Sequence, residues 1–348
     1  MIVSMKERIH YIDVAKGILI ILVILHHFPQ LLMEQYGVSN SFLKFLDSAS
    51  DYYNAFFMPA FFIITGYCTN FSKLPFSKFF VHQVYTIMIP AFCLGAVSVW
   101  ISLLGKGCTE PVEYCKIGFS TFIKSGGPFW FLTALFWSKL FYKLWICLLQ
   151  NKENVSRKCF HITTSLFCLS LFIIGCLLKN NAIPNIWWFI HALLLTTFLY
   201  VGQILRLYHV RKISVIISLL YLLAIVLLNL NNISHPYITA GINADIIDFP
   251  LLLSLAISGS MLIFHISQHI NNNSIIEYFG KNSLIIYCLH ISTMSLVFKQ
   301  GGKLIGIPLM ESSLASIIEL LISLLVILLF VCLLNKKYFR FFQGKFKY

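Results

Sequence analysis

The stretch YIDVAKGILIILVILHHF, residues 11–28, decides the fold class of this protein. Its centre, residues 17–25, is an unbroken apolar run, and a helix needs about 20 mostly apolar residues to cross a hydrocarbon core about 30 Å thick. The same stretch carries four ionisable side chains, namely Asp13, Lys16, His26 and His27. A charged side chain at the centre of a membrane helix costs about 2.5–3.5 kcal/mol. The stretch therefore predicts a membrane-spanning helix that carries functional groups.

Nine further apolar stretches follow this one along the chain. The ten predicted spans cover about 12–32, 53–71, 84–104, 129–149, 160–178, 186–205, 213–230, 246–265, 283–298 and 314–334. The ninth is short for a full span, so we expect it to be less tilted or partly re-entrant. The pattern predicts an all-α, polytopic membrane protein with about ten transmembrane helices.

The composition excludes several other classes of protein. Of the 348 residues, 58% are hydrophobic and only 11% are charged. Soluble domains carry about 25% charged residues, so a soluble globular enzyme, a disordered chain, a coiled coil and collagen are all excluded. The formal net charge is +13, but the basic residues lie between the apolar stretches. This placement predicts contact with the headgroups of a lipid bilayer, and nucleic acid is not an expected partner.

Lys and Arg lie predominantly on one side of the predicted membrane. With the N-terminus inside, seven of the 26 fall in external loops and three in or beside helices, which leaves sixteen inside. The external ones are Lys44, Lys106, Lys116, Lys124, Lys179, Lys299 and Lys303; those in or beside helices are Lys16, Lys139 and Lys143. This bias predicts that both termini are cytoplasmic. We expect one membrane-embedded domain over residues 1–348, with no appended soluble domain, in the cytoplasmic (inner) membrane.

The ten cysteines do not predict a metal site. They include no CxxC pair and no Cys/His cluster at metal-ligand spacing. Cys108 and Cys115 share one predicted external loop, and whether they pair is left open.

The polar residues of the first span share one side of the predicted helix. Lys16 and His27 are eleven residues apart, which places them within about 20° of one stripe and roughly 16 Å apart along the axis. Asp13 lies one turn before Lys16 and can pair with it. A lysine near the inner face can bind an anion, and a histidine further across can act as a base near neutral pH. Alternatively, Lys16 snorkels to the headgroups and His27 caps the outer end of the helix.

Four elements of the sequence, in order, resemble those of one known family. They are the Lys-x10-His pair of the first span, FFMPAFFIITGYC in the second, GPFWFLTALF at the fourth and SLIIYCLHI in the ninth. The matching residues are Lys16 and His27; Met58, Pro59, Phe61, Phe62, Thr65, Gly66 and Tyr67; Gly127, Pro128, Trp130, Phe131 and Leu132; Tyr287 and His290. With ten predicted spans, the chain resembles the acyltransferase-3 family of integral membrane acyltransferases over nearly its whole length.

The resemblance implies an acyl-CoA-dependent O-acetyltransferase. Members of that family take an acetyl group from cytoplasmic acetyl-CoA and pass it to a hydroxyl of a cell-surface or lipid-linked sugar, which is a modification of polysaccharides. The expected partners are therefore acetyl-CoA, a sugar or polysaccharide acceptor and the bilayer. The resemblance implies His27 as the general base, with Lys16, oriented by Asp13, beside a phosphate of the donor.

One departure from the family pattern concerns the charge that meets the donor. The family has a basic run ahead of a proline after the second span, whereas this chain has only Lys78 and His82 before Pro90. If that run contacts the phosphates of the donor, other residues must supply the charge here. We expect it from Arg206, Arg211 or Lys212.

Four more residues are candidates for contacts with the substrate. Trp130 and Tyr67 can line a path for the sugar or the pantetheine arm, although aromatic residues in spans also serve as packing or interfacial residues. His290 can form a second polar wall. Glu319 is an acid at membrane depth, so it either pairs internally or lines a cavity. Asp245 and Asp248 are expected in a solvated loop.

Two other functions remain open on the sequence alone. A transporter or exporter without transfer chemistry also places ionisable residues at mid-membrane, typically in broken helices within repeated halves. No matching halves are visible in this sequence. An inactive relative that acts as a scaffold in a polysaccharide-export complex is the third reading. Consumption of acetyl-CoA that depends on His27 separates the enzyme from both.

Overall fold

The structure, a computed structural model, describes residues 10–106, 112, 116, 119–120, 129–150, 156–208, 214–231, 233–270, 274–305 and 312–336. Seven residues named above, namely Cys108, Cys115, Lys124, Gly127, Pro128, Arg211 and Lys212, lie outside this part of the chain. The described elements are α1 (His10–Gln30), the π-helical turn η1 (Leu31–Gln35), α2 (Ser41–Ser50), α3 (Phe57–Cys68), α4 (Phe76–Gln83), the π-helical turn η2 (Val84–Met88), α5 (Ile89–Lys106), α7 (Trp130–Gln150), α8 (Arg157–Asn180), the 3-10 turn η3 (Ile186–Trp188), α9 (Phe189–Leu207), α10 (Ser214–Leu230), the strands β1 (Tyr237–Ile238) and β2 (Ile242–Asn243), the 3-10 turn η4 (Ile246–Asp248), α11 (Phe249–His269), α12 (Ser274–Lys281), α13 (Ser283–Ile305) and α15 (Ser313–Leu334).

The helices confirm the predicted fold class. Eight helical segments in the described part of the chain are long and apolar enough to span a bilayer, and each falls on a predicted span. The other two predicted spans form shorter apolar helices, α3 and α10. The two strands are two residues each and pair antiparallel, so sheet contributes almost nothing to the described fold. The protein is an all-α, polytopic membrane protein.

The second and ninth spans differ in length from their predictions. The helix in the second covers only the 12 residues of α3, or about 18 Å, because the preceding residues form turns. Pro59 lies in the first turn of α3, where a missing backbone N–H is tolerated. The ninth span was predicted to end at 298, but α13 runs for 23 residues. Lys299, Gln300 and Lys303 extend the helix beyond the apolar run that marked it.

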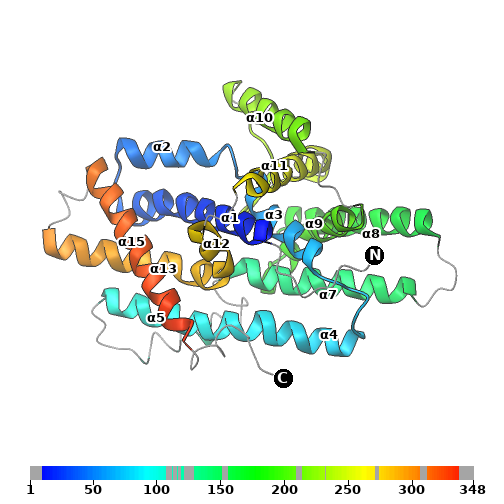
Figure 1. The fold of residues 1–348 in the computed structure, drawn as a ribbon, viewed down its shortest axis with the longest axis horizontal. Coiled ribbons are helices and arrows are strands. Elements are labelled where there is room, and N and C mark those ends of the chain that lie inside the picture. Colours follow the sequence, from blue (N-terminus) through cyan, green and yellow to red (C-terminus); the bar gives the residue numbers. More distant parts are fainter. Residues whose placement is uncertain are drawn as a thin grey trace.

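Helix α1 runs through the middle of the molecule (Figure 1) and contacts α2, α3, α11, α12 and α13. A second group of contacts joins α3 to α9 and joins α9 to both α7 and α8. Helix α13 packs between α5 and α15, and α10 packs mainly against α11. The arrangement places the polar side chains of α1 inside the bundle, within reach of α3, α7, α12 and α13.

Two helix crossings in this bundle depend on glycine. A side chain at Gly17 or Gly280 would collide with the backbone of the facing helix, so α1 and α12 touch at these residues. Gly66 and Gly202 do the same for α3 and α9. Small residues allow such close backbone approach between membrane helices. The first crossing brings the C-terminal end of α12 beside the polar turn of α1.

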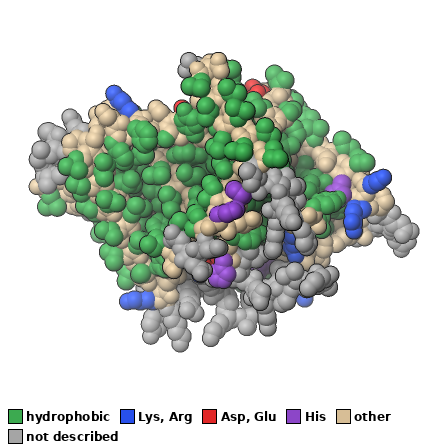
Figure 2. Space-filling view, turned by 45° about the horizontal axis from the view of Figure 1, so that its top comes forward, with side chains coloured by type: hydrophobic (Ala, Val, Ile, Leu, Met, Phe, Trp, Pro, Cys, Tyr) green, Lys and Arg blue, Asp and Glu red, His purple; other side chains and the backbone are tan. Residues whose placement is uncertain are grey.

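The outer surface is apolar over wide areas. Figure 2 shows hydrophobic side chains over most of the face in view, with few charged groups among them. Large apolar side chains of α15 illustrate this: Leu314, Leu321, Leu325 and Leu329 are each more than half exposed. The opposite stripe of that helix, which includes Ser316, Glu319 and Ser323, is buried. Soluble proteins rarely expose contiguous apolar patches of this extent, whereas lipid favours them.

Candidate active site

A cavity of about 360 Å³ opens beside the polar turn of α1. Residues of α1, α3, η2, α7, α12 and α13 line it. Its lining is mostly apolar, with polar side chains contributed by Asp13, Lys16, Thr65, Lys139, Lys281 and Tyr287 among others. We call it the lysine pocket, because Lys16, Lys139 and Lys281 all face it.

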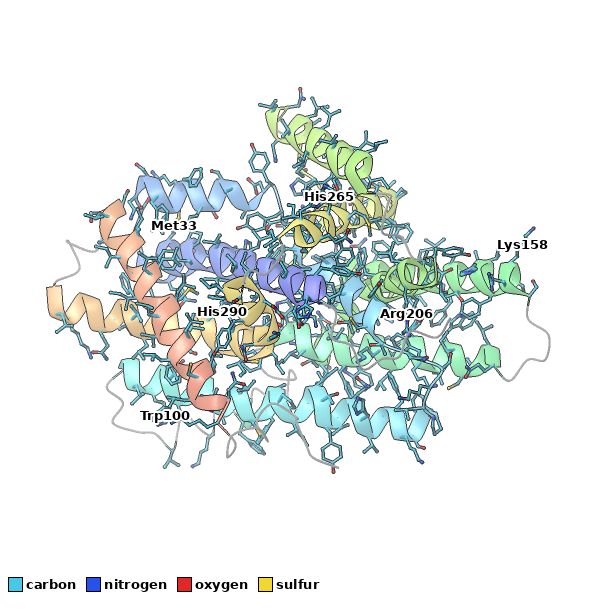
Figure 3. All side chains as sticks on the ribbon, in the orientation of Figure 1. Met33, Trp100, Lys158, Arg206, His265 and His290 are labelled. Atoms are coloured by element: carbon cyan, nitrogen blue, oxygen red, sulfur yellow. The ribbon has the colours of Figure 1, made fainter. Side chains whose placement is uncertain are left out.

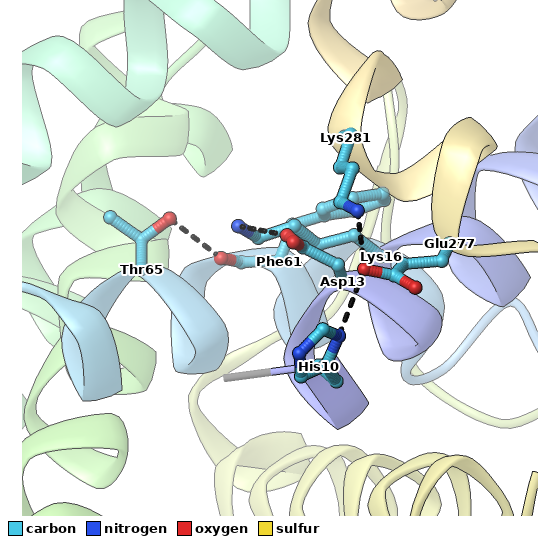
Figure 4. Close-up of polar contacts among 7 residues, drawn as sticks. All are labelled: His10, Asp13, Lys16, Phe61, Thr65, Glu277 and Lys281. Carbon is cyan, nitrogen blue, oxygen red and sulfur yellow. Dashed lines mark hydrogen bonds and ion pairs between the residues drawn. The ribbon is translucent and has the colours of Figure 1, made fainter. Parts of the chain in front are cut away.

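Two sets of charged groups on α1 and α12 lie beside the pocket (Figure 4). Lys16 Nζ lies 3.8 Å from Asp13 Oδ1, so the predicted pair is present. On α12, Lys281 pairs with Glu277, whose Oε1 also lies 3.1 Å from His10 Nδ1. The hydrogen bond from Lys281 holds the pKa of the Glu277 carboxyl below its usual value. Two of the three lysines of the pocket therefore have a carboxylate beside them.

The third lysine of the pocket was not singled out from the sequence. Lys139 lies on α7, with its Nζ 5.9 Å from the centroid of the Phe79 ring. Its position inside the fourth apolar span is the same signal that identified Lys16, since an ionisable residue at membrane depth is a candidate site residue. Lys281 was counted only as an internal loop cation, because no sequence pattern placed α12 against α1.

His27 lies further along α1, outside the lining of the lysine pocket. Its Nδ1 is 3.2 Å from Gln30 Oε1, which lies on the next turn of the same helix. The ring of His290 on α13 is 5.2 Å away, centroid to centroid, and His26 is 5.0 Å away on the other side. His26 is buried and packs against Tyr53 and Phe57, as expected for a packing residue.

His290 is buried with a defined tautomer (Figure 3 labels it on α13). Its Nδ1 lies 2.8 Å from Tyr287 O and 3.2 Å from Ile286 O. A carbonyl oxygen only accepts, so Nδ1 carries the proton and Nε2 carries the lone pair. Nε2 has no hydrogen-bond partner among the described residues. The predicted second polar residue thus lies beside His27 and presents an acceptor.

Two aromatic side chains of the pocket lining pack on each other, and one of them also packs beside His290. Tyr287 lines the pocket and its ring centroid is 6.1 Å from that of His290. Phe131, at the start of α7, packs against Tyr287 at 5.4 Å, and its backbone N–H donates to the Tyr287 hydroxyl at 3.3 Å. Lys16 and His27 are on one helix, as predicted, but only Lys16 lines the pocket.

The remaining candidates lie outside the lysine pocket. Arg206 on α9 (Figure 3) donates from Nη1 to Thr69 O at 3.2 Å, at the end of α3. The Tyr67 hydroxyl accepts from that of Tyr11 at 3.1 Å. Trp130 packs with Trp188 and His191 in a separate aromatic cluster.

Glu319 is buried on α15, and neither carboxyl oxygen has a hydrogen-bond partner in the described part of the chain. It does not reach the lysine pocket, so the alternative of an acid that lines a cavity is not supported for this cavity. Asp245 and Asp248 cap η4 through a reciprocal backbone contact, and Asp245 pairs with Lys179 at 3.0 Å. The described residues contain no cluster of three or more His, Cys, Asp or Glu able to hold a metal.

These features define a membrane protein with a cationic pocket and a pair of histidines on neighbouring helices. The family model of the acyltransferase domain matches residues 9–336, nearly the whole chain. The chain belongs to the acyltransferase-3 family of membrane acyltransferases. Neither a comparison with curated proteins nor one with solved structures finds a match. The family establishes acyl transfer as the class of activity and, with the apolar helices, a multi-pass membrane protein.

Proposed function

We propose that this protein transfers an acetyl group from cytoplasmic acetyl-CoA to a hydroxyl of a cell-surface or lipid-linked sugar, in the cytoplasmic membrane. The observation that carries the proposal is the order of groups along α1. The lysine pocket lies beside Lys16, and His27 lies about three turns further along the same helix, with His290 of α13 beside it. A lysine pocket suited to an anion and a histidine suited to act as a base thus lie on one helix.

The chemistry assigned to His27 is general base catalysis. With Nδ1–H donated to Gln30 Oε1, the lone pair of His27 is on Nε2. Nε2 takes the proton of the sugar hydroxyl, the oxygen attacks the thioester carbonyl, and the C–S bond breaks to release CoA. The proton on His27 then passes to the departing thiolate, so the base is regenerated.

The proposed reaction also requires the thioester to pass from the lysine pocket to the His27–His290 pair. The path of the thioester to His27 runs past Tyr287 and Phe131 in this proposal, since both line the pocket and Tyr287 packs beside His290. The two aromatic side chains also keep water from the thioester while the donor is bound. This arrangement favours transfer over hydrolysis.

The experiment is an assay of CoA release by the purified protein with acetyl-CoA and a panel of sugars. We expect His27→Ala to lower the rate by about 10²–10⁴-fold, as is typical when a general base is removed. His269→Ala is the matched control, because His269 is exposed at the end of α11. Binding of acetyl-CoA without any release of CoA would instead support a transporter or a scaffold.

A further inference from the structure

The lysine pocket gathers positive charge from three separate helices. Lys16 comes from α1, Lys139 from α7 and Lys281 from α12. Lys16 and Lys139 are partly buried, so their charges are less screened than those of surface lysines, whereas Lys281 is exposed at the edge of the pocket. The sequence separates them by more than a hundred residues each, and only the fold makes them neighbours of one cavity.

The three lysines differ in how their charges are balanced. Lys16 has Asp13 beside it and Lys281 has Glu277. Within the described part of the chain, no carboxylate forms an ion pair with Lys139, whose ammonium lies over the face of Phe79. The pocket therefore carries an excess of positive charge, centred on Lys139.

Lys143, one turn beyond Lys139 on α7, has a structural role and serves as a comparison. Lys143 is buried and donates from Nζ to Phe71 O at 2.7 Å, and it does not line the pocket. Lys139 has no such carbonyl in the described structure and faces the cavity instead.

We propose that Lys139, together with Lys16 and Lys281, binds the diphosphate of a diphosphate ester in this pocket. Three ammonium groups from different directions suit a multiply charged anion, and charge-assisted hydrogen bonds to phosphate are strong. The inference rests on the proposed function for its ligand, because acetyl-CoA carries a diphosphate. Lys139 and Lys281 thereby supply the charge that is missing between the second and third spans. A lipid-linked sugar carries the same group, so the experiment separates the two sources.

The first arm uses inorganic pyrophosphate, which needs no assumption about the reaction. Binding to the full-length protein in nanodiscs is measured by calorimetry. Lys139→Gln should raise the Kd of pyrophosphate by on the order of ten-fold or more, whereas Lys139→Arg should retain binding. Lys299→Gln is the matched control, because Lys299 Nζ lies 5.8 Å over the Tyr36 ring and outside the pocket. Unchanged binding in folded Lys139→Gln and Lys281→Gln would overturn the proposal.

A second variant should change the affinity for pyrophosphate in the opposite direction. Glu277→Gln removes the carboxylate beside Lys281 and keeps its shape, so the positive charge of the pocket rises. We expect pyrophosphate to bind roughly two- to five-fold more tightly, the range of an exposed ion pair. Weaker binding in this variant would contradict an electrostatic anion site.

The second arm identifies the source of the diphosphate. Lys139→Gln should weaken the binding of acetyl-CoA but leave S-acetylpantetheine, which has the same thioester and no phosphate, unchanged. If a short polyprenyl diphosphate depends on Lys139 and acetyl-CoA does not, the lipid-linked acceptor is the ligand and the donor assignment is overturned. If pyrophosphate binding depends on Lys139 but acetyl-CoA does not bind to the wild-type protein, the proposed function fails while the anion site stands.

Discussion

At the scale of single residues, the two histidines differ in how their tautomers are fixed. The backbone of α13 fixes His290, because two carbonyl oxygens lie at its Nδ1. Only a side chain, that of Gln30, contacts Nδ1 of His27. In the proposed reaction His27 carries a proton until the thiolate takes it, and the ring of His290 lies beside His27 with 5.2 Å between the centroids. We therefore expect His290 to act as a positioning residue through His27.

The corresponding prediction concerns His290→Ala and His290→Gln. We expect His290→Ala to lower kcat by a smaller factor than His27→Ala, with the KM for acetyl-CoA little changed. His290→Gln keeps a side-chain acceptor and should retain more activity than His290→Ala. Initial rates of CoA release measure both. Residues that act as a unit are not additive, so a double variant much slower than His27→Ala alone would refute this role.

At the scale of elements, the crossing of α1 and α12 determines where Lys281 lies. The glycine contacts that allow this crossing cannot be predicted from hydropathy. Helix α12 is also too short and too polar to be predicted as a membrane span. Likewise, α13 continues through Gly301 and Gly302, which a pattern of apolar residues alone does not predict. Hydropathy alone therefore predicts neither the position of α12 nor the end of α13.

We predict that Gly280→Val separates α1 from α12. The added side chain would overlap the backbone at Asp13, and overpacking of this kind typically costs about 1–3 kcal/mol. Thermal unfolding in detergent should show a lower Tm, and pyrophosphate binding should weaken as Lys281 moves. Gly241→Val serves as the control, since a side chain there meets open space in the hairpin between β1 and β2. Equal Tm values for the two variants would refute the close crossing.

At the scale of the whole molecule, the distribution of Lys and Arg predicts how the chain is oriented in the membrane. It predicts that α8 begins in the cytoplasm near Arg157 and ends outside near Asn181. In a background without accessible native cysteines, an impermeant maleimide should label Asn181→Cys in intact cells and leave Arg157→Cys unlabelled. Labelling in the reverse order would invert the orientation of the whole chain and place the lysine pocket on the other side.

The sequence by itself determined the fold class, the positions of the spans and the pairing of Asp13 with Lys16. These follow from local periodicity and from the cost of charge in hydrocarbon, both of which can be read along one helix. Only the tertiary structure decided that Lys139 and Lys281 join Lys16, that His290 meets His27, and that Trp130 and Glu319 lie elsewhere. Those outcomes depend on which helix faces touch across long sequence separations. That choice is made by backbone contacts at glycines such as Gly17 and Gly280, and by the packing of Phe131 on Tyr287.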